Sequence, residues 1–217
     1  FEAAPRKLYF KNSIKKIEIL YLDGQHKNNA LVKPHVFPYT ALYLDPYGSL
    51  MRKNQHYTIN ELGFIFIART MKSILVKDGG EKLSKNFSYH GIINKKGENC
   101  HMIMYENKEF AYYDYTVGKN ESVATIAIKH SLSDYMIRSK NNLHSYYGTI
   151  KEGQVIKLPN NYCAKATLFI SEKTKLPIAI NLYDEKDLWE SYEHSNIIVN
   201  KPIDAAEFTR SYKDYNF

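Results

Sequence analysis

The chain lacks most of the features that mark catalytic, metal-binding or membrane-spanning proteins. Its 217 residues contain no His-Glu-x-x-His, no Gly-x-Ser-x-Gly and no phosphate-binding loop. Its eight histidines are scattered, and the pairs that could meet, His26 with His35 and His130 with His144, do not have the spacing of metal ligands. No apolar run approaches the roughly 20 residues needed to cross a bilayer. We therefore expect no enzymatic activity, no metal site and no cofactor.

Cysteine is also scarce, with two residues in the chain. If the strands around residues 115 and 160 pair antiparallel, Cys163 lies opposite Tyr112, and Cys100 lies about 12 residues further along, near 40 Å away at roughly 3.3 Å per residue. A disulfide requires Cα atoms within about 7 Å. We therefore predict two free, mostly buried thiols.

Arginine-rich helices and zinc-finger spacings are absent, although the chain carries a net charge of +7. Its lysines are spread along the sequence, so no nucleic-acid partner is expected. A basic surface favours phosphate-bearing lipid head groups or acidic wall polymers, and the alternative is a solvated surface with no specific partner. The chain starts at Phe1 without a signal peptide or a nearby cysteine, which we interpret as processing or as a fragment that is incomplete at its N-terminus.

The middle of the chain has the clearest local pattern. Residues 112–117 are aromatic and β-branched, which predicts a strand. Ser122 is a good N-cap. Val123, Ile126 and Ala127 follow it at positions i, i+3 and i+4, which predicts a helix with one narrow apolar stripe.

A second helix is predicted after Ser133, another N-cap, with Asp134 in the first turn, where the helix dipole favours negative charge. Asn141 is expected to end this helix in the left-handed conformation. A Gly-Gln turn precedes residues 155–158, which read as a strand ended by proline. Local chemistry alone thus predicts the order strand, helix, helix, strand.

Residues 115–159 resemble a LysM module, the βααβ unit with which many cell-envelope proteins hold N-acetylglucosamine polymers such as peptidoglycan. The likeness rests on the spacing from Tyr115 to Asn141 and on the ending Gly-Gln-x-Ile-x-Leu-Pro. Three places depart from the family pattern. Asn-Glu-Ser at 120–122 replaces Gly-Asp-Thr, Lys140 replaces an apolar residue, and Glu152 replaces a proline.

The resemblance implies a sugar groove between two loops, residues 118–122 and residues 142–152. Their polar groups would bond acetamido and hydroxyl groups, and their aromatic rings would stack on a sugar. For the two tyrosines the alternative is that one packs on the module and the other on the surrounding domain. The expected glycan contacts are Asn120, Glu121, Ser122, Asn142, Tyr146 and Tyr147.

The sequence around this insert predicts an antiparallel sheet with one long helix. The run Thr58-Ile59-Asn60-Glu61 reads as a capping box, and a helix is expected over residues 59–77 with a wide apolar face that lies on the sheet. A Lys-Lys-Gly-Glu turn predicts a hairpin of residues 86–94 and 99–106. Because strands resume after the insert, one sheet is expected to continue on either side of it.

This surrounding part resembles the LolA/LolB-type fold, in particular its outer-membrane-lipoprotein-sorting-like relatives in Bacteroidetes. The likeness rests on the run LMRKNQHYTINELGF at residues 50–64 and on a diffuse C-terminal pattern. That pattern comprises Thr174-x-Leu176-Pro177, Tyr183-Asp184, Asn196, Asn200 and Phe208. The resemblance implies an α+β fold with a strongly curved antiparallel half-barrel over residues 1–114 and 160–217, from which the LysM-like insert 115–159 hangs. The helix would cover an apolar hollow for a lipid or acyl chain through Leu62, Phe66, Ile67 and Met71.

Three functional hypotheses follow. The first is a non-catalytic protein of the periplasm or outer-membrane-associated envelope whose insert binds peptidoglycan or a related glycan. The second is a carrier or sensor for a lipid or a lipoprotein acyl chain. The third is a wall hydrolase, which needs two carboxyl groups about 5 to 10 Å apart, and Asp114, Glu121 and Glu152 are the candidates.

Overall fold

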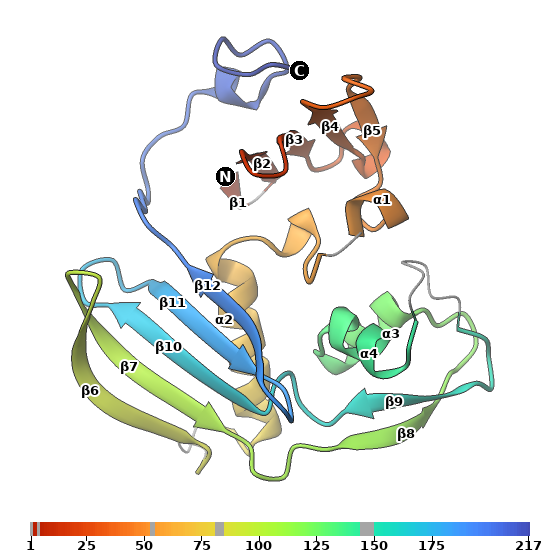
Figure 1. Ribbon diagram of the computed structural model, residues 1–217, viewed down its shortest axis with the longest axis vertical. Coiled ribbons are helices and arrows are strands. Elements are labelled where there is room, and N and C mark those ends of the chain that lie inside the picture. Colours follow the sequence, from red (N-terminus) through yellow and green to blue (C-terminus); the bar gives the residue numbers. More distant parts are fainter. Residues whose placement is uncertain (1, 4, 53–54, 81–84, 144–149) are drawn as a thin grey trace. The chain divides into compact units, whose positions relative to one another are not determined.

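The computed structural model describes residues 2–3, 5–52, 55–80, 85–143 and 150–217. The protein has mixed α+β structure with antiparallel sheets and few helices (Figure 1), and none of the three sheets formed by the described strands closes into a barrel. The chain divides into two compact units. Residues 1–60 and 200–217 form an N-terminal unit, and residues 61–199 form a central unit.

The N-terminal unit is built on a five-stranded sheet whose strands follow one another in chain order. These strands are β1 (Glu2–Ala3), β2 (Arg6–Asn12), β3 (Ile17–Leu22), β4 (Ala30–Pro34) and β5 (Leu42–Leu44). The unit also contains four short helices: η1 (His26–Asn28), α1 (Ser49–Arg52), η2 (Ile59–Glu61) and η3 (Ala205–Phe208). The last residue of η2, Glu61, already belongs to the central unit. The chain's last residues return to this sheet, where the Tyr215 ring stacks on Tyr9 at a centroid distance of 3.7 Å. The strands before the long helix thus form their own sheet, whereas the sequence suggested a single curved one.

The long helix is shorter than its pattern predicted. α2 spans Phe64–Lys77, and Gly63 is its N-cap without a side-chain hydrogen bond. Gly63 has φ 102° and ψ 173°, a conformation that side-chain-bearing L-residues rarely adopt. The predicted start at Ile59 was wrong, because this glycine separates the 3₁₀ turn η2 from the helix proper.

The sheet of the central unit has the strand order β12-β11-β10-β7-β6. Its strands are β6 (Phe87–Lys95), β7 (Glu98–Glu106), β10 (Lys165–Ser171), β11 (Pro177–Tyr183) and β12 (Leu188–Glu193). The predicted hairpin is confirmed as β6 and β7, which turn at Lys96 and Gly97, both with positive φ. α2 lies across one face of this sheet (Figure 1).

The sheet continues across the insertion, as predicted. β7 lies before residues 115–159 and β10 lies after them, and the two pair directly, with Glu106 opposite Lys165. The insertion therefore leaves the sheet from one strand end and returns at the neighbouring one. Tyr105, Ala166 and Leu182, at adjacent register positions, are all buried. The insertion thus interrupts the sequence of the sheet without interrupting its packing.

Both cysteines are free and buried, which confirms the thiol prediction. Their separation along the sheet is smaller than expected. Lys165 lies opposite Glu106, Cys163 lies two residues before Lys165, and Cys100 lies six residues before Glu106. Eight residues still correspond to about 26 Å. Burial raises the pKa of the Cys163 thiol to about 12, so little reactive thiolate forms at neutral pH.

Candidate glycan-binding site

The insertion folds on itself. Its strands β8 (Tyr112–Thr116) and β9 (Val155–Pro159) form a separate two-stranded antiparallel sheet, with Tyr115 opposite Ile156. Helices α3 (Val123–His130) and α4 (Asp134–Lys140) complete the unit. The predicted order strand, helix, helix, strand is confirmed. Its buried core consists of Val117, Val123, Ile126, Ala127, Leu132, Ile137, Ile156 and Leu158.

The first helix begins at the predicted cap. The Ser122 hydroxyl accepts a hydrogen bond from the Thr125 amide at 3.2 Å, and the Ser122 amide donates to Thr125 Oγ1 at 2.8 Å. This reciprocal pair is a capping box in which threonine takes the place usually held by Glu or Gln. The cap fixes the direction in which residues 118–122 enter α3. This segment is called the glycan loop below, because the sequence predicted sugar contacts in it.

The second helix confirms its start and corrects its end. The Ser133 hydroxyl accepts from the Met136 amide at 3.3 Å, as predicted for an N-cap, and Asp134 lies in the first turn. Asn141, however, has φ −101°. The left-handed residue is Asn142, with φ 53°, one position later. The prediction of a left-handed asparagine after α4 was right about the residue type and wrong by one position.

Asn141 has a different role, which the sequence did not indicate. Its side-chain amide donates to the carbonyl of Ile137 and to that of Lys157, both at 2.8 Å. Its Oδ1 accepts from the Lys157 amide at 2.7 Å. The side chain thus makes with β9 the pair of bonds that a residue of a neighbouring strand makes. This contact ties the end of α4 to the small sheet.

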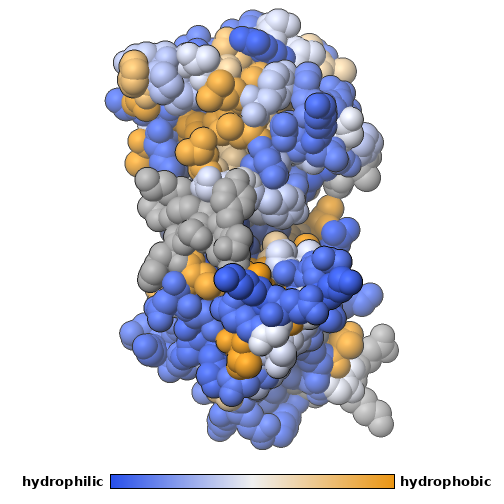
Figure 2. All heavy atoms as spheres, turned by 90° about the vertical axis from the view of Figure 1, so that its right-hand side faces the viewer, coloured by the Kyte–Doolittle hydropathy of each residue, from blue (hydrophilic) through white to orange (hydrophobic). Residues whose placement is uncertain are grey.

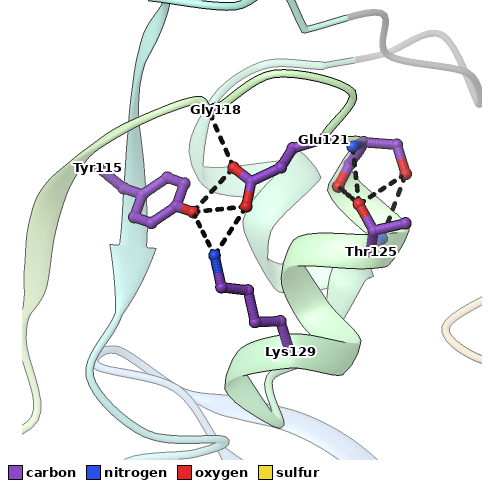
Figure 3. A network of polar contacts seen from close by, with 6 residues as sticks. Tyr115, Gly118, Glu121, Thr125 and Lys129 are labelled. Carbon is purple, nitrogen blue, oxygen red and sulfur yellow. Dashed lines mark hydrogen bonds and ion pairs between the residues drawn. The ribbon is translucent and has the colours of Figure 1, made fainter.

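The glycan loop is held by the Glu121 carboxylate (Figure 3). Glu121 accepts hydrogen bonds from the Gly118 amide at 2.8 Å and from the Tyr115 hydroxyl at 2.8 and 2.9 Å. The Lys129 ammonium on α3 lies 2.9 Å from the same carboxylate. One side chain therefore connects the strand, the loop and the helix. These contacts fix the loop backbone.

These donors favour the ionised carboxylate. The bond from Lys129, the Gly118 amide and the Tyr115 hydroxyl together hold the pKa of Glu121 at about 2. A glycosidase general acid needs the opposite shift. Asp114, a second carboxylate of the hydrolase hypothesis, is exposed and paired with Lys157 at 2.8 Å. Neither has the environment of a general acid.

The described candidate sugar contacts differ in exposure. Asn120, Ser122 and Asn142 are exposed, whereas Glu121 is half-buried within its network. Asn120 adopts φ 59°, and Asn142 likewise has a positive φ. Tyr146 and Tyr147 lie outside the described residues.

Lys140, one of the departures from the family pattern, contacts the hairpin of β11 and β12 in the sheet of the central unit. Its ammonium lies 2.8 Å from Glu185 Oε1, in the turn between β11 and β12, and 4.0 Å from the centre of the Tyr112 ring. The Tyr112 hydroxyl donates to Glu185 Oε2 at 3.1 Å. The position that holds an apolar residue in the family here links the module to its host sheet.

Further contacts join the module to the rest of the central unit. The Tyr135 and Trp189 rings, on α4 and β12, have centroids 5.6 Å apart. The Lys77 ammonium at the end of α2 donates to the carbonyl of His130 at 2.6 Å. The module is therefore packed against its host at more than one point.

The expected lid residues lie on or just before α2. Leu62, Phe66, Ile67 and Met71 are half-buried. The Phe66 ring meets Tyr162 edge to face, with centroids 6.4 Å apart. Lining of a hollow by these residues stays a prediction.

The histidine pairs considered from sequence do not form ligand sets in the described part of the chain. His26 contacts Tyr43, and His35 lies 3.2 Å from the buried carboxylate of Glu18. His144 lies outside the described residues. Within the residues that the structure describes, no cluster of three or more His, Cys, Asp or Glu could hold a metal ion.

Over the same described ranges, no helix is long and apolar enough to cross a membrane. No curated protein and no solved structure matches the chain. The LysM domain family matches residues 115–159. LysM domains are carbohydrate-binding, non-catalytic modules of extracellular and cell-envelope proteins that bind peptidoglycan and chitin-like glycans. The closed βααβ unit at residues 115–159 is therefore a LysM domain.

Proposed function

We propose that this protein is a non-catalytic component of the periplasm or outer-membrane-associated cell envelope that docks on peptidoglycan or a related N-acetylglucosamine-containing glycan. The observation that carries the proposal is the match of residues 115–159 to the LysM family, together with their closure as a βααβ unit with its own two-stranded sheet and buried core. The preformed glycan loop supports it, because a loop ordered in advance loses less conformational entropy on binding.

The proposed sugar contacts divide into two kinds. Asn120 and Asn142 are exposed and offer side-chain donors and acceptors to acetamido and hydroxyl groups. Ser122 is exposed as well, and its hydroxyl, which already bonds Thr125, would accept one further hydrogen bond from a sugar. Tyr146 and Tyr147 would add stacking. For Glu121, whose carboxylate already accepts from three residues, we propose that it acts chiefly by holding the loop in place.

Sedimentation with insoluble peptidoglycan tests the proposal. The full chain should co-sediment, and removal of residues 118–159 should abolish this. Asn120→Ala and Asn142→Ala each remove one polar contact and should weaken binding by about tenfold, because an unpaired hydrogen-bonding group costs roughly 1–3 kcal/mol. Asn200→Ala is the matched control, since Asn200 is also exposed with positive φ but lies in the N-terminal unit. Equal sedimentation of all variants would refute docking through the LysM domain.

For the host we propose a LolA/LolB-like domain with a lipid or lipoprotein acyl chain as its ligand, as a second candidate function. What supports it is an antiparallel five-stranded sheet with the amphipathic helix α2 across one face. Mass spectrometry of lipid extracted from the purified protein tests this. A lipid that is retained by the parent and lost in Met71→Glu would support it, and equal retention in both would count against the α2 site.

A further inference from the structure

The N-terminal unit contains a pocket away from the LysM domain in sequence. It has a volume of about 230 Å³ and lies between the end of β3, the turn before β4, the edge strand β5 and the segment after η3. It is lined by Leu20, Leu22, Gln25, His26, Asn29, Leu31, Tyr43, Phe208, Thr209 and Arg210. These residues come from distant parts of the chain, so the pocket is a product of the folded unit.

The lining has an apolar base and an aromatic wall. Leu20, Leu31 and Phe208 are buried. The His26 and Tyr43 rings pack together, with centroids 4.2 Å apart and their polar atoms, Tyr43 hydroxyl and His26 Nε2, 3.3 Å apart. Apolar side chains also gather on a face of the part built from β1–β5, in the upper half of Figure 2. A ligand here would meet a compact apolar surface.

Three residues with polar side chains, Gln25, Asn29 and Arg210, also line the pocket. Among the described residues, the side-chain amides of Gln25 and Asn29 and the guanidinium of Arg210 have no hydrogen-bond or ion-pair partner. A second cation lies near, because the Lys7 ammonium is 5.3 Å from the centre of the Phe208 ring. Small-molecule sites combine an apolar lining with a few polar side chains, and this pocket has both.

The turn that carries the wall is strained. His26, Lys27 and Asn28 have φ values of 48°, 58° and 60°, three consecutive left-handed residues without a glycine. This conformation costs a residue such as Lys27 roughly 1–2 kcal/mol relative to the right-handed form, and it costs asparagine less. The Asn28 side chain holds the turn by accepting from the Gly24 amide at 2.8 Å. Strain that the fold maintains at one place is typical of ligand sites.

We propose that this pocket binds a small carboxylate-bearing ligand with a compact apolar body. Arg210 would bind the carboxylate with its planar N–H fork, which suits that group better than a point charge does. The leucines and Phe208 would take the body, Tyr43 with His26 would cover one side of it, and the two amides would bond any hydroxyl or amide it carries. The volume limits the ligand to one smaller than a drug-sized molecule.

Chemical-shift titration of the full chain tests the proposal with four probes. Hexanoate and glucuronate are a short acyl carboxylate and an acidic sugar, and 1-hexanol and glucose are their uncharged counterparts. A carboxylate should shift the amide signals of the lining residues in a saturable way, at least about tenfold more tightly than its uncharged counterpart. Hexanoate should bind more tightly than glucuronate, because the base of the pocket is apolar, and tighter binding of glucuronate would overturn the apolar body of the proposal.

Variants make the test specific. Arg210→Gln should weaken carboxylate binding by about tenfold or more and leave the uncharged probe unaffected. Tyr43→Ala should weaken both. Arg69→Gln, an exposed arginine of α2 in the other unit, is the matched control and should change neither. The proposal is overturned if neither carboxylate shifts the lining residues at millimolar concentration, or if Arg210→Gln and Arg69→Gln bind alike. Arg210 has no partner in the described fold, so its loss should leave the melting temperature unchanged.

Discussion

Two exposed turns of the molecule differ in how far their polar groups are hydrogen-bonded within the protein. In the glycan loop, residues 118–122, the Glu121 carboxylate is fully engaged, because it accepts from Gly118, Tyr115 and Lys129. The turn at residues 25–29 contains three left-handed residues, and within the described part of the chain the side-chain amides of Gln25 and Asn29 have no partner. The glycan loop is held rigid by hydrogen bonds within the protein. The second turn maintains strain and retains unused hydrogen-bonding capacity, which a ligand could satisfy.

The largest expected effect breaks one region and spares the other. Changing Ile126, which is fully buried in the LysM core, to Ala should lower the free energy of unfolding by about 2–5 kcal/mol. Urea unfolding followed by amide signals should show this loss in the LysM domain, with the signals of residues 25–29 unmoved under native conditions. Ile128→Ala is the control, because Ile128 is 69% exposed on the same helix and should change stability little. Equal losses in the two variants would contradict the packing described above.

The next effect concerns the cap that orients the glycan loop. Ser122→Ala removes the acceptor for the Thr125 amide and should destabilise the domain by about 1 kcal/mol. Ser139→Ala, in the body of α4, should be neutral or slightly stabilising, because alanine favours helix. Thermal unfolding of both variants gives the comparison. An unchanged melting temperature for Ser122→Ala would mean that the loop does not depend on its cap.

Glycine substitutions compare the strain in the two turns directly. Lys27→Gly should stabilise the protein by up to about 1 kcal/mol, because glycine takes the left-handed conformation without a Cβ penalty. Asn120→Gly should stabilise by only a few tenths, about 0.3 kcal/mol, since asparagine already tolerates this conformation. Urea midpoints measure both. If Lys27→Gly destabilises the protein, the strain assigned to residues 26–28 is absent.

The smallest effect is electrostatic and depends on pH. Folding lowers the pKa of Glu121 from 4.5 to about 2, so its contribution to stability is complete above about pH 4.5 and is lost as the pH falls toward 2. Glu121→Gln should flatten this part of the stability curve. The effect is small because the partner Lys129 is exposed and salt screens the pair. A curve of unchanged slope between pH 5 and 2 would show that another group titrates there.

The sequence predicted those features of the LysM domain that depend on neighbouring residues. The caps at Ser122 and Ser133 and the apolar stripe at Val123, Ile126 and Ala127 were correct, because each involves residues three or four apart. The family pattern supplied the closure of β8 on β9, which local propensity does not contain.

Features that depend on distant partners escaped prediction. The capping-box motif at residues 58–61 predicted a helix start at Ile59, whereas the backbone conformation of Gly63 delays the start to Phe64. The Lys140–Glu185 pair joins residues 45 positions apart, and no periodicity marks it. The pocket of the N-terminal unit combines residues near 20, 43 and 208. Sequence spacing could indicate neither the ion pair nor the pocket, because only the tertiary fold brings such residues together.

The amide of Asn141 has a consequence for assembly. Strand edges with free backbone groups recruit other chains, and a module that gathers on a polymer meets its own copies at high local concentration. At Lys157 that opportunity is closed, because both backbone groups are already occupied by one side chain. If the domain docks on a glycan as proposed, copies bound along one polymer strand would therefore not associate as a β-sheet through this position.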